Sequence, residues 1–521
     1  MRPLDRPNVL LITTDEQRAD HVGFGGDPVV RTPHLDALAE SGVTFDTAYV
    51  ANPTCMPNRA SIVTGRLPSS HGTRVNGLAL DRDAQTFARV LRRDGYRTAL
   101  IGKAHLQPLG HGADEVGRLL SERPGGDAVS RGWPAGWDTL EWLERHREGW
   151  VDVGDNYYGF DHVRLTGGIS AAAGGHYLHW LRQQGVDPSK RLGPANARWR
   201  SSLWDQVFMP DLPAELSTTS YITDRTSEFM SQAVAAGKPF LAWCSFPDPH
   251  HPFAPPPEYF DRYRPDEVGV PESFADRHER SMPHIRKILT GMGAPNGPFQ
   301  VWAPTEAQLR EALAAQYGSI EQIDDAVGRL LRELDRLGVA ENTVVVFTSD
   351  HGDMGGDHGL LLKHAVHYEA CIRVPLVVRV PGTTPGRCSS LVSSLDIAPS
   401  ILELTGSGGY GGIQGRSLLP LIDNPGRSLR DALLIEEDQI FGVEGLPAPI
   451  RMRTVVTDRF RYTRYAGQQH GELFDRSSDP AELDNIFGMA AAGSLQRELT
   501  ERLVAELLAS ADEARAPTHM A

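Results

Sequence analysis

Four short apolar runs, each the length of a strand, are spaced along the chain. They are rich in Val, Ile and Leu without alternation, which is typical of strands buried on both faces of a parallel sheet. The runs cover residues 8–14, 97–101, 240–246 and 343–349. Helical patterns lie between them. Strands that alternate with helices predict an α/β sandwich with a large, mostly parallel central sheet flanked by helices.

Two of the predicted helices have clear end signals. One follows Thr32, begins with a proline and closes before Gly42, an order typical of an N-cap, a first helical residue and a C′ residue. Another begins with a predicted capping box, formed by Thr305 and Gln308, and continues as a long apolar-periodic stretch to Gly338.

Each predicted strand is followed by residues that can do chemistry. These residues are Asp15, Lys103 with His105, His250 with His251, and Asp350 with His351. Ligands of open α/β sheets bind outside the carboxyl ends of the strands. A single residue of this kind is usually the cap of the next helix, but four strands that end this way indicate one polar site.

The pattern changes near residues 422–426. Short β-type runs follow at 432–436, 453–457 and 460–465, and a last helix is predicted at about 494–509. We therefore expect a large α/β domain over residues 1–425 and a smaller α+β domain with an antiparallel sheet over 426–521. Irregular stretches at 108–213, 247–257 and 283–304 are expected to be lids or pocket walls, or else disordered.

The composition narrows the class of protein. Lys and Arg total 52 against 67 Asp and Glu, a net charge of −15, which disfavours nucleic acid and anionic membranes as bulk partners. No run approaches the roughly 20 apolar residues of a membrane helix, so a cytoplasmic location is the default expectation. Only 4 Cys in 521 residues exclude a disulfide scaffold, and they lack the C-x-x-C pairs of a structural zinc site.

The densest motif surrounds the first cysteine, in residues 53–66, PTCMPNRASIVTGR. Pro57 suits the first turn of a helix, which would place Cys55 at the helix N-terminus, an anion-binding position. Arg59 adds a fixed positive charge, and a thiol there is expected to have a lowered pKa. A lone cysteine is more often a small buried apolar residue. We accept that interpretation for the other three, Cys244, Cys371 and Cys388.

The Cys-x-Pro-x-Arg of residues 55–59 resembles the signature of the sulfatase family, in the alkaline phosphatase superfamily. Supporting motifs lie at residues 8–12, 32–36, 101–105, 249–252, 349–352, 357–360 and 472–475. The resemblance implies an alkaline-phosphatase-like sandwich. It also implies that a separate formylglycine-generating enzyme oxidises Cys55 to Cα-formylglycine. The hydrate of that aldehyde would be the nucleophile and would pass through a covalent sulfo-enzyme intermediate.

The resemblance implies a metal site. Carboxylates at the ends of distant strands can converge on one hard divalent cation. The implied ligands are Asp15, Asp350 and the formylglycine made from Cys55, with Glu16 and His351 at the next two family positions. The histidine is similar to the phosphonate monoester hydrolase branch, and a nitrogen ligand shifts the preference from Ca²⁺ towards Mn²⁺. Both metals remain open.

The resemblance also implies roles around a small-molecule sulfate ester. Arg59 would steady the formylglycine hydrate, while Lys103 and His105 would contact the sulfate, with His105 as a base. His250 and Lys363 would face the leaving group, and one of them would be its acid. A further position, Asn76, lies where the phosphonate branch has an asparagine that helps bind substrate.

Two alternatives stay open. The first is a phosphonate monoester or phosphodiester hydrolase of the same superfamily, which His351 and Asn76 favour. Lys103 and His105 oppose it, since that branch has Tyr and Thr there. The second is a non-catalytic, metal-stabilised binding protein, which would require Cys55 to remain unmodified. The natural ester and a homo-oligomeric state are also left open.

Overall fold

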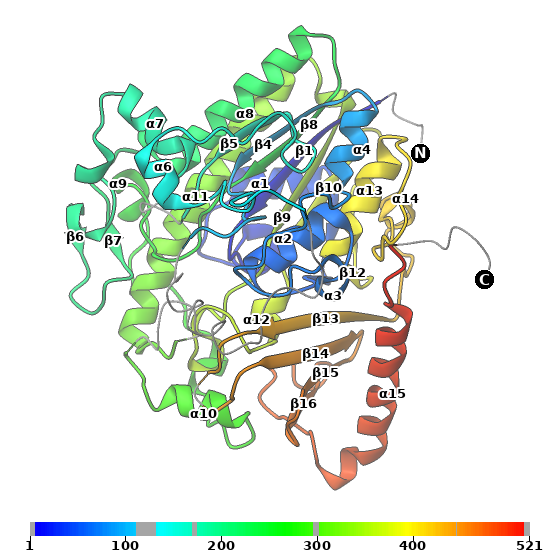
Figure 1. Cartoon of the computed structure of the whole chain (residues 1–521). Helices are drawn as coiled ribbons and strands as arrows, with labels where there is room; N and C mark the ends of the chain where they lie inside the picture. Colours follow the sequence, from blue (N-terminus) through cyan, green and yellow to red (C-terminus); the bar gives the residue numbers. More distant parts are fainter. Residues whose placement is uncertain (1–5, 111–131, 169–173, 295–301, 444, 515–521) are drawn as a thin grey trace.

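The computed structural model describes residues 6–110, 132–168, 174–294, 302–443 and 445–514. A sheet of eight strands, in the order β11-β2-β10-β9-β1-β8-β4-β5, crosses the larger part of the molecule (Figure 1). The strands are β1 (Asn8–Thr14), β2 (Val43–Phe45), β4 (Arg97–Gly102), β5 (His162–Leu165), β8 (Phe240–Ser245), β9 (Thr343–Ser349), β10 (Leu376–Arg379) and β11 (Gly386–Cys388). Within it β10 runs antiparallel to both β9 and β2. The predicted mostly parallel central sheet is therefore confirmed.

Both faces of the sheet are buried, which explains the continuous apolar runs. On β1, Val9 and Leu11 pack on one side and Leu10 and Ile12 on the other. The first side is covered by α2 (Cys55–Thr64), α4 (Phe87–Arg93) and α13 (Ile397–Leu404). The second side is covered by α1 (Pro33–Glu40), α8 (Thr218–Ala235) and α11 (Glu306–Arg336). None of the helices in the described ranges has the length and apolar character needed to span a bilayer.

The two predicted helix starts have different outcomes. The capping box of Thr305 and Gln308 is present at the start of α11. By contrast, the Thr32 side chain does not cap α1, and its Oγ1 accepts a hydrogen bond from the Gly23 N–H instead. The cap of α1 comes from another helix, because Asp324 of α11 accepts the N–H groups at the start of α1. Gly42 also lacks the positive φ of a C′ glycine.

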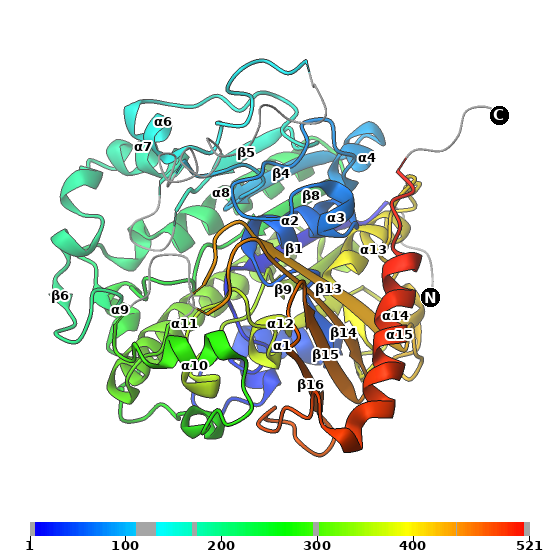
Figure 2. The same ribbon diagram turned by 60° about the horizontal axis from the view of Figure 1, so that its bottom comes forward.

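A second, antiparallel sheet lies beside the large one, on the side of α3 (Pro68–His71), as both views show (Figures 1 and 2). Its strands are β13 (Ala432–Gln439), β14 (Ile450–Thr457), β15 (Phe460–Tyr465) and β16 (Gly471–Asp475), and α15 (Gly493–Ala509) packs on β13 and β14. The predicted C-terminal antiparallel sheet and last helix are confirmed, with β16 as an additional strand. The predicted boundary after residue 425 stays a prediction.

The stretches predicted to be irregular contain more regular structure than expected. Parts of them lie outside the described residues. The described parts contain α6 (Leu143–Glu148), β5, α7 (His176–Gln183), β6 (Trp199–Arg200), β7 (Phe208–Met209) and α10 (Pro283–Leu289). The prediction was wrong for α10, where Met282, Ile285 and Ile288 are buried against the second sheet. The remaining short elements are β3 (Ala48–Tyr49), α9 (Pro257–Phe260), α12 (Glu369–Ile372), β12 (Val392–Ser393) and α14 (Leu419–Asp423).

Candidate active site

The four predicted strands lie side by side, and their carboxyl ends meet at one edge of the sheet. Backbone hydrogen bonds continue past the strands: Asp350 N–H donates to Thr14 O at 3.1 Å, and Asp15 N–H donates to Asp248 O at 3.2 Å. Lys103 N–H likewise donates to Ser245 O at 2.9 Å. The polar residues that follow each strand are thereby placed together at this edge of the sheet, and their side chains are buried.

Cys55 is the first residue of α2, as the motif predicted. Every residue of this helix is buried, so its N-terminus does not face solvent. The Thr54 side chain does not cap the helix. The Met56 N–H in the first turn donates to Asn76 Oδ1 at 3.1 Å. Asn76, 21 residues after Cys55 in the sequence, thus contacts the first turn of the helix that Cys55 begins.

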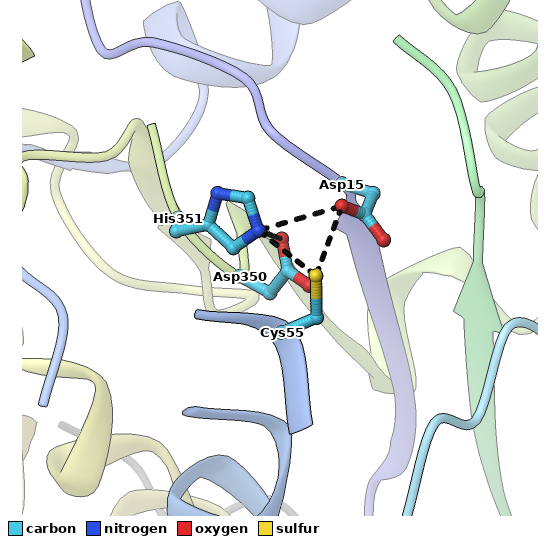
Figure 3. A group of neighbouring side chains, drawn as sticks. All are labelled: Asp15, Cys55, Asp350 and His351. Carbon is cyan, nitrogen blue, oxygen red and sulfur yellow. Dashed lines mark hydrogen bonds and ion pairs between the residues drawn. The ribbon is translucent and has the colours of Figure 1, made fainter. Parts of the chain in front are cut away.

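Four metal-ligating side chains surround one point (Figure 3). Cys55 Sγ lies 3.1 Å from His351 Nε2 and 3.8 Å from Asp15 Oδ1. The same Nε2 lies 3.6 Å from Asp15 Oδ1 and 3.7 Å from Asp350 Oδ1. All four side chains are buried. Two carboxylate oxygens, a sulfur and an imidazole nitrogen form a donor set that fits a divalent cation.

Arg59 joins the two carboxylates of this group. Its Nε donates to Asp350 Oδ2 at 2.6 Å and its Nη2 to Asp15 Oδ2 at 3.2 Å. Lys103 Nζ forms an ion pair with Asp15 as well. Burial alone would raise the pKa of Asp15, but Lys103 and the other neighbouring cations outweigh burial and hold that pKa well below its usual range. The carboxylate is therefore ionised, as a metal ligand must be.

The orientation of His351 also fits a ligand. Its Nδ1–H donates to Gly352 O at 2.8 Å, which directs Nε2 at the other three side chains. Backbone acceptors of this kind fix the tautomer and direction of metal-binding imidazoles. Although burial lowers the pKa of His351, Asp350 and Cys55 outweigh burial and raise that pKa to about 10. The group of four thus attracts positive charge at the position that Nε2 faces.

A second group of buried side chains lies next to the first, and Glu16 is at its centre. Lys363 Nζ donates to Glu16 Oε1 at 2.8 Å. His250 Nε2 and His251 Nδ1 each lie 3.1 Å from Glu16 Oε2. Glu16 has a φ of +65°, which turns its side chain away from that of Asp15. The expectation that Glu16 is a metal ligand stays a prediction. In this structure its carboxylate contacts Lys363 and His250, the two residues expected at the leaving group.

Proton positions follow from these contacts. Lys363 Nζ lies 2.6 Å from His250 Nε2, and His250 Nδ1–H donates to His251 O at 2.6 Å. Burial, with Lys363 beside it, holds the pKa of His250 well below its usual range. Burial would also lower the pKa of Lys363, but Glu16, Cys55 and Asp15 together outweigh burial and raise that pKa. Lys363 is therefore the proton carrier of the pair, and His250 Nε2 accepts its hydrogen bond.

His105 is positioned by an acid that carries no motif. Glu141 accepts hydrogen bonds from the backbone N–H groups of residues 105, 106 and 107, at 2.6, 2.9 and 2.8 Å, and from Tyr157 Oη at 2.6 Å. These contacts hold His105 at a φ of +50°. Its Nδ1 is buried and makes no hydrogen bond with the described residues. Burial and then Lys103 hold the pKa of His105 well below its usual range, so the imidazole is neutral.

Asp353 is a further buried acid that the sequence did not single out. Its Oδ1 accepts from Leu362 N–H at 3.1 Å. Burial and then the Glu16 carboxylate raise the pKa of Asp353 to about 7. The remaining cysteines are also buried, Cys244 in β8, Cys371 in α12 and Cys388 in β11. Of these, Cys371 lies near the second group, where its Sγ donates to Leu362 O at 3.4 Å.

Comparisons with known proteins place this site in a family context. A family model described as Sulfatase matches residues 7–407, and one described as N-sulphoglucosamine sulphohydrolase, C-terminal, matches residues 356–508. An ulvan-active sulfatase of Formosa agariphila is 28% identical over 98% of this chain and 82% of its own length. A multifunctional alkaline phosphatase superfamily protein, PehA of Trinickia caryophylli, is 28% identical over 99% and 98%.

Solved structures agree with the fold. A phosphonate monoester hydrolase of Agrobacterium radiobacter superposes with a TM-score of 0.78 at 25% identity, over 97% of this chain and 96% of that one. The predicted alkaline-phosphatase-like sandwich is thereby confirmed. The roles of the individual side chains rest on their geometry and chemistry.

Proposed function

The chain belongs to the sulfatase family, and from this we propose that it hydrolyses sulfate esters of small molecules with a nucleophile derived from Cys55. The observation that carries the proposal is the buried meeting of Cys55, two carboxylates and His351 at the N-terminus of α2. A sulfate ester needs a nucleophile, positive charge around its oxygens and an acid for the departing alcohol. The site contains candidates for all three.

A divalent cation would be held by Asp15, Asp350, His351 and the modified Cys55, with Ca²⁺ and Mn²⁺ as the two candidates. When bound, it would supply Lewis-acid stabilisation of the anionic ester. The imidazole nitrogen in the donor set favours Mn²⁺. Conversion of Cys55 to Cα-formylglycine by a formylglycine-generating enzyme would supply an aldehyde hydrate. One hydroxyl would attack sulfur and displace the alcohol. Deprotonation of the other hydroxyl would then re-form the aldehyde, break the C–O bond to the sulfate and release it without attack by a second water.

The fixed cations bind and orient the sulfate. Arg59 is buried with no exposed surface and contacts Asp350 and Asp15, so it stabilises the nucleophile's end of the site. Lys103 is buried beside Asp15 and would face the sulfate oxygens. His105 is neutral with a buried Nδ1, which suits a base that removes the proton from the second hydroxyl.

Proton delivery to the leaving alcohol is assigned to Lys363 and His250. Lys363 carries the proton and lies 2.6 Å from His250 Nε2, so the Lys363 ammonium would give the proton to an alkoxide that approaches this pair. Glu16 holds both residues by direct contacts. A mechanism of this kind predicts that the pair matters most for esters of weakly acidic alcohols, whose alkoxides leave poorly.

A substrate panel tests the proposal. We expect the protein, loaded with Mn²⁺ or Ca²⁺, to turn over an aryl sulfate with a higher kcat/KM than a phosphonate monoester or a phosphodiester. Metal analysis of the same preparation identifies the ion. A sulfate turned over far more slowly than the phosphorus esters would overturn the assignment.

That outcome would favour a second candidate, a phosphonate monoester or phosphodiester hydrolase. His351 and the similarity to the Agrobacterium radiobacter hydrolase support it. Lys103 and His105 oppose it, because two further cationic or basic groups suit the non-bridging oxygens of a sulfate monoester.

Mass spectrometry of the peptide that contains Cys55 tests the nucleophile. Exchange of the thiol for the aldehyde lowers the mass by roughly 18 Da, unlike the mass gain on ordinary thiol oxidation. Only unmodified thiol in protein from the native host would exclude the formylglycine mechanism and favour the non-catalytic binding protein.

A further inference from the structure

Lys363 sits in a backbone segment of unusual conformation. Its neighbours Leu362, His364 and Ala365 have φ values of +72°, +96° and +56°. Residues with a side chain adopt this region at a cost in free energy and stay there only where surrounding contacts require it. We call residues 362–367 the lysine loop. Its contacts therefore decide where the Lys363 ammonium lies.

The central contact of the lysine loop comes from the second sheet. Glu437 of β13 has no exposed surface, and its Oε1 accepts from Ala365 N–H at 2.9 Å. Its Oε2 lies 3.0 Å from His367 Nε2. Gln439, two residues along β13, donates from Nε2 to Glu437 Oε1 at 2.7 Å and lies 3.0 Å from His364 Nδ1. One carboxylate thus contacts the loop on both sides of its turn.

The other contacts of the loop lie at different atoms. Asp353 accepts the Leu362 N–H, and His284 Nε2 lies 2.9 Å from Ala365 O. These contacts remain when the Glu437 carboxylate is removed. Its loss would free Ala365 N–H and His367 Nε2, while His367 Nδ1 stays 2.7 Å from Thr454 Oγ1 and the start of the loop stays bound. The expected result is a displaced lysine in a protein that still folds.

We infer that Glu437 is a positioning residue, which holds the lysine loop so that Lys363 reaches the leaving group. The inference rests on the proposed role of Lys363. It makes the second sheet a working part of the active site, although that sheet contributes none of the residues assigned to metal or sulfate.

The hydrogen-bond pattern explains why an acid occupies this position. A backbone N–H, an amide N–H and an imidazole all face the carboxylate, and each needs an acceptor. Burial alone would raise the pKa of Glu437, but the hydrogen bond and charge of His367, together with His364 and the Ala365 N–H, outweigh burial and lower that pKa. A glutamine could still accept from Ala365, but it would present an N–H group where one of these donors points.

The adjacent residue provides a matched control. Glu436 is also buried in β13, 3% exposed, but its carboxylate points to α3. There it accepts from Ser69 N–H at 2.8 Å and from Ser69 Oγ at 2.9 Å. Removing this carboxylate disturbs the same strand and the same sheet without touching the lysine loop.

The experiment measures kcat/KM on aryl sulfates whose phenols range from strongly to weakly acidic, for Glu437→Ala, Glu437→Gln and Glu436→Ala. Displacement of a catalytic group by about 1 Å costs up to about 100-fold in rate. We expect Glu437→Ala to lose about 10- to 100-fold on the least acidic phenol and less than about threefold on the most acidic. Glu437→Gln should show a smaller loss of the same kind, and Glu436→Ala no dependence on the phenol.

Two further measurements separate this inference from the proposed function. In a Lys363→Ala background, Glu437→Ala should add less than about twofold, since the residue that it positions is gone. Hydrogen exchange should become faster over residues 362–367 in Glu437→Ala and stay unchanged there in Glu436→Ala. The exchange result needs no substrate.

The outcomes are distinct. If the loss of kcat/KM in Lys363→Ala does not depend on the acidity of the phenol, the proposed role of Lys363 is overturned. The catalytic part of the inference is then overturned with it. A normal Lys363→Ala effect, combined with an equal loss on all esters or unchanged exchange in both Glu437 variants, would overturn the role of Glu437 alone.

Discussion

The two groups of buried charge in the site begin from adjacent residues, yet they do different things. Asp15 meets Cys55 and His351, whereas Glu16 meets Lys363 and two histidines. The cause is the backbone, because a φ of +65° at Glu16 turns its side chain away from that of Asp15. Neighbours in a motif therefore need not share a ligand. Three predictions test this division, and a fourth tests a buried acid outside both groups.

The largest effect is expected at the nucleophile. Cys55→Ala should lower kcat on any ester by at least about 10³-fold, the size expected when a covalent nucleophile is removed. The control is Cys388→Ala, another buried cysteine, which lies in β11 and should retain near-normal turnover. Substantial residual activity in Cys55→Ala would refute covalent catalysis by this residue.

Metal content distinguishes the two groups directly. Asp350→Asn should lose most of its bound Mn²⁺, because it removes a charged donor from the group of four. Glu16→Gln should keep the metal but lose about 10²-fold in kcat/KM on poorly leaving alcohols, since Lys363 loses its partner. The measurement is elemental analysis of both purified variants after dialysis. Equal metal loss in the two would place Glu16 in the ligand set.

Within the second group, the two histidines should differ. His250 Nε2 contacts both Lys363 Nζ and Glu16 Oε2, whereas His251 Nδ1 contacts Glu16 Oε2. We expect His250→Gln to cost about 10²-fold on poorly leaving alcohols and His251→Gln about tenfold or less. The measurement is kcat/KM of both variants on two esters whose leaving alcohols differ in acidity. A larger effect at His251 would exchange their roles.

The smallest effect concerns a buried acid outside both groups. Asp324 accepts backbone N–H groups of α1 and makes no ion pair with a described residue. Burial raises its pKa to about 7. An acid with a raised folded pKa stabilises the fold fully below its unfolded pKa, and this contribution is lost as pH rises through about 7.

We therefore expect the Tm of Asp324→Asn, taken relative to that of the parent protein, to be about 1 °C higher at pH 8 than at pH 5. Differential scanning fluorimetry at the two pH values measures the gain. Asp335→Asn, at an exposed position of the same helix, should show no such change. A gain of opposite sign would mean that the carboxylate is stabilised as an anion.

Much of this architecture is predictable from the sequence. Continuous Val and Ile runs located β1, β4, β8 and β9 to within one residue, because burial on both faces permits little else. The polar residues after these strands lie together because parallel strands end together. The cysteine motif located the start of α2 through Pro57 and the helix N-terminus.

The rest depends on contacts that no local pattern encodes. Glu141 and Glu437 are single acids without a motif, and their function arises only when distant backbone N–H groups meet them. The placement of Glu16 depends on one dihedral angle, and the cap of α1 comes from Asp324, 292 residues beyond Thr32, instead of from Thr32 itself. Such cases require the tertiary structure.

The burial of Cys55 has a consequence for the order of folding and modification. The side chain lies in the interior, 3% exposed, at the start of a fully buried helix. If Cys55 is modified as proposed, the maturation enzyme would have to reach it before α2 packs, so modification would compete in time with folding. The active fraction of a preparation would then equal the share of molecules that were modified before α2 packed. Slower folding or more maturation enzyme during synthesis would raise that fraction, whereas treating the folded protein afterwards would leave it unchanged.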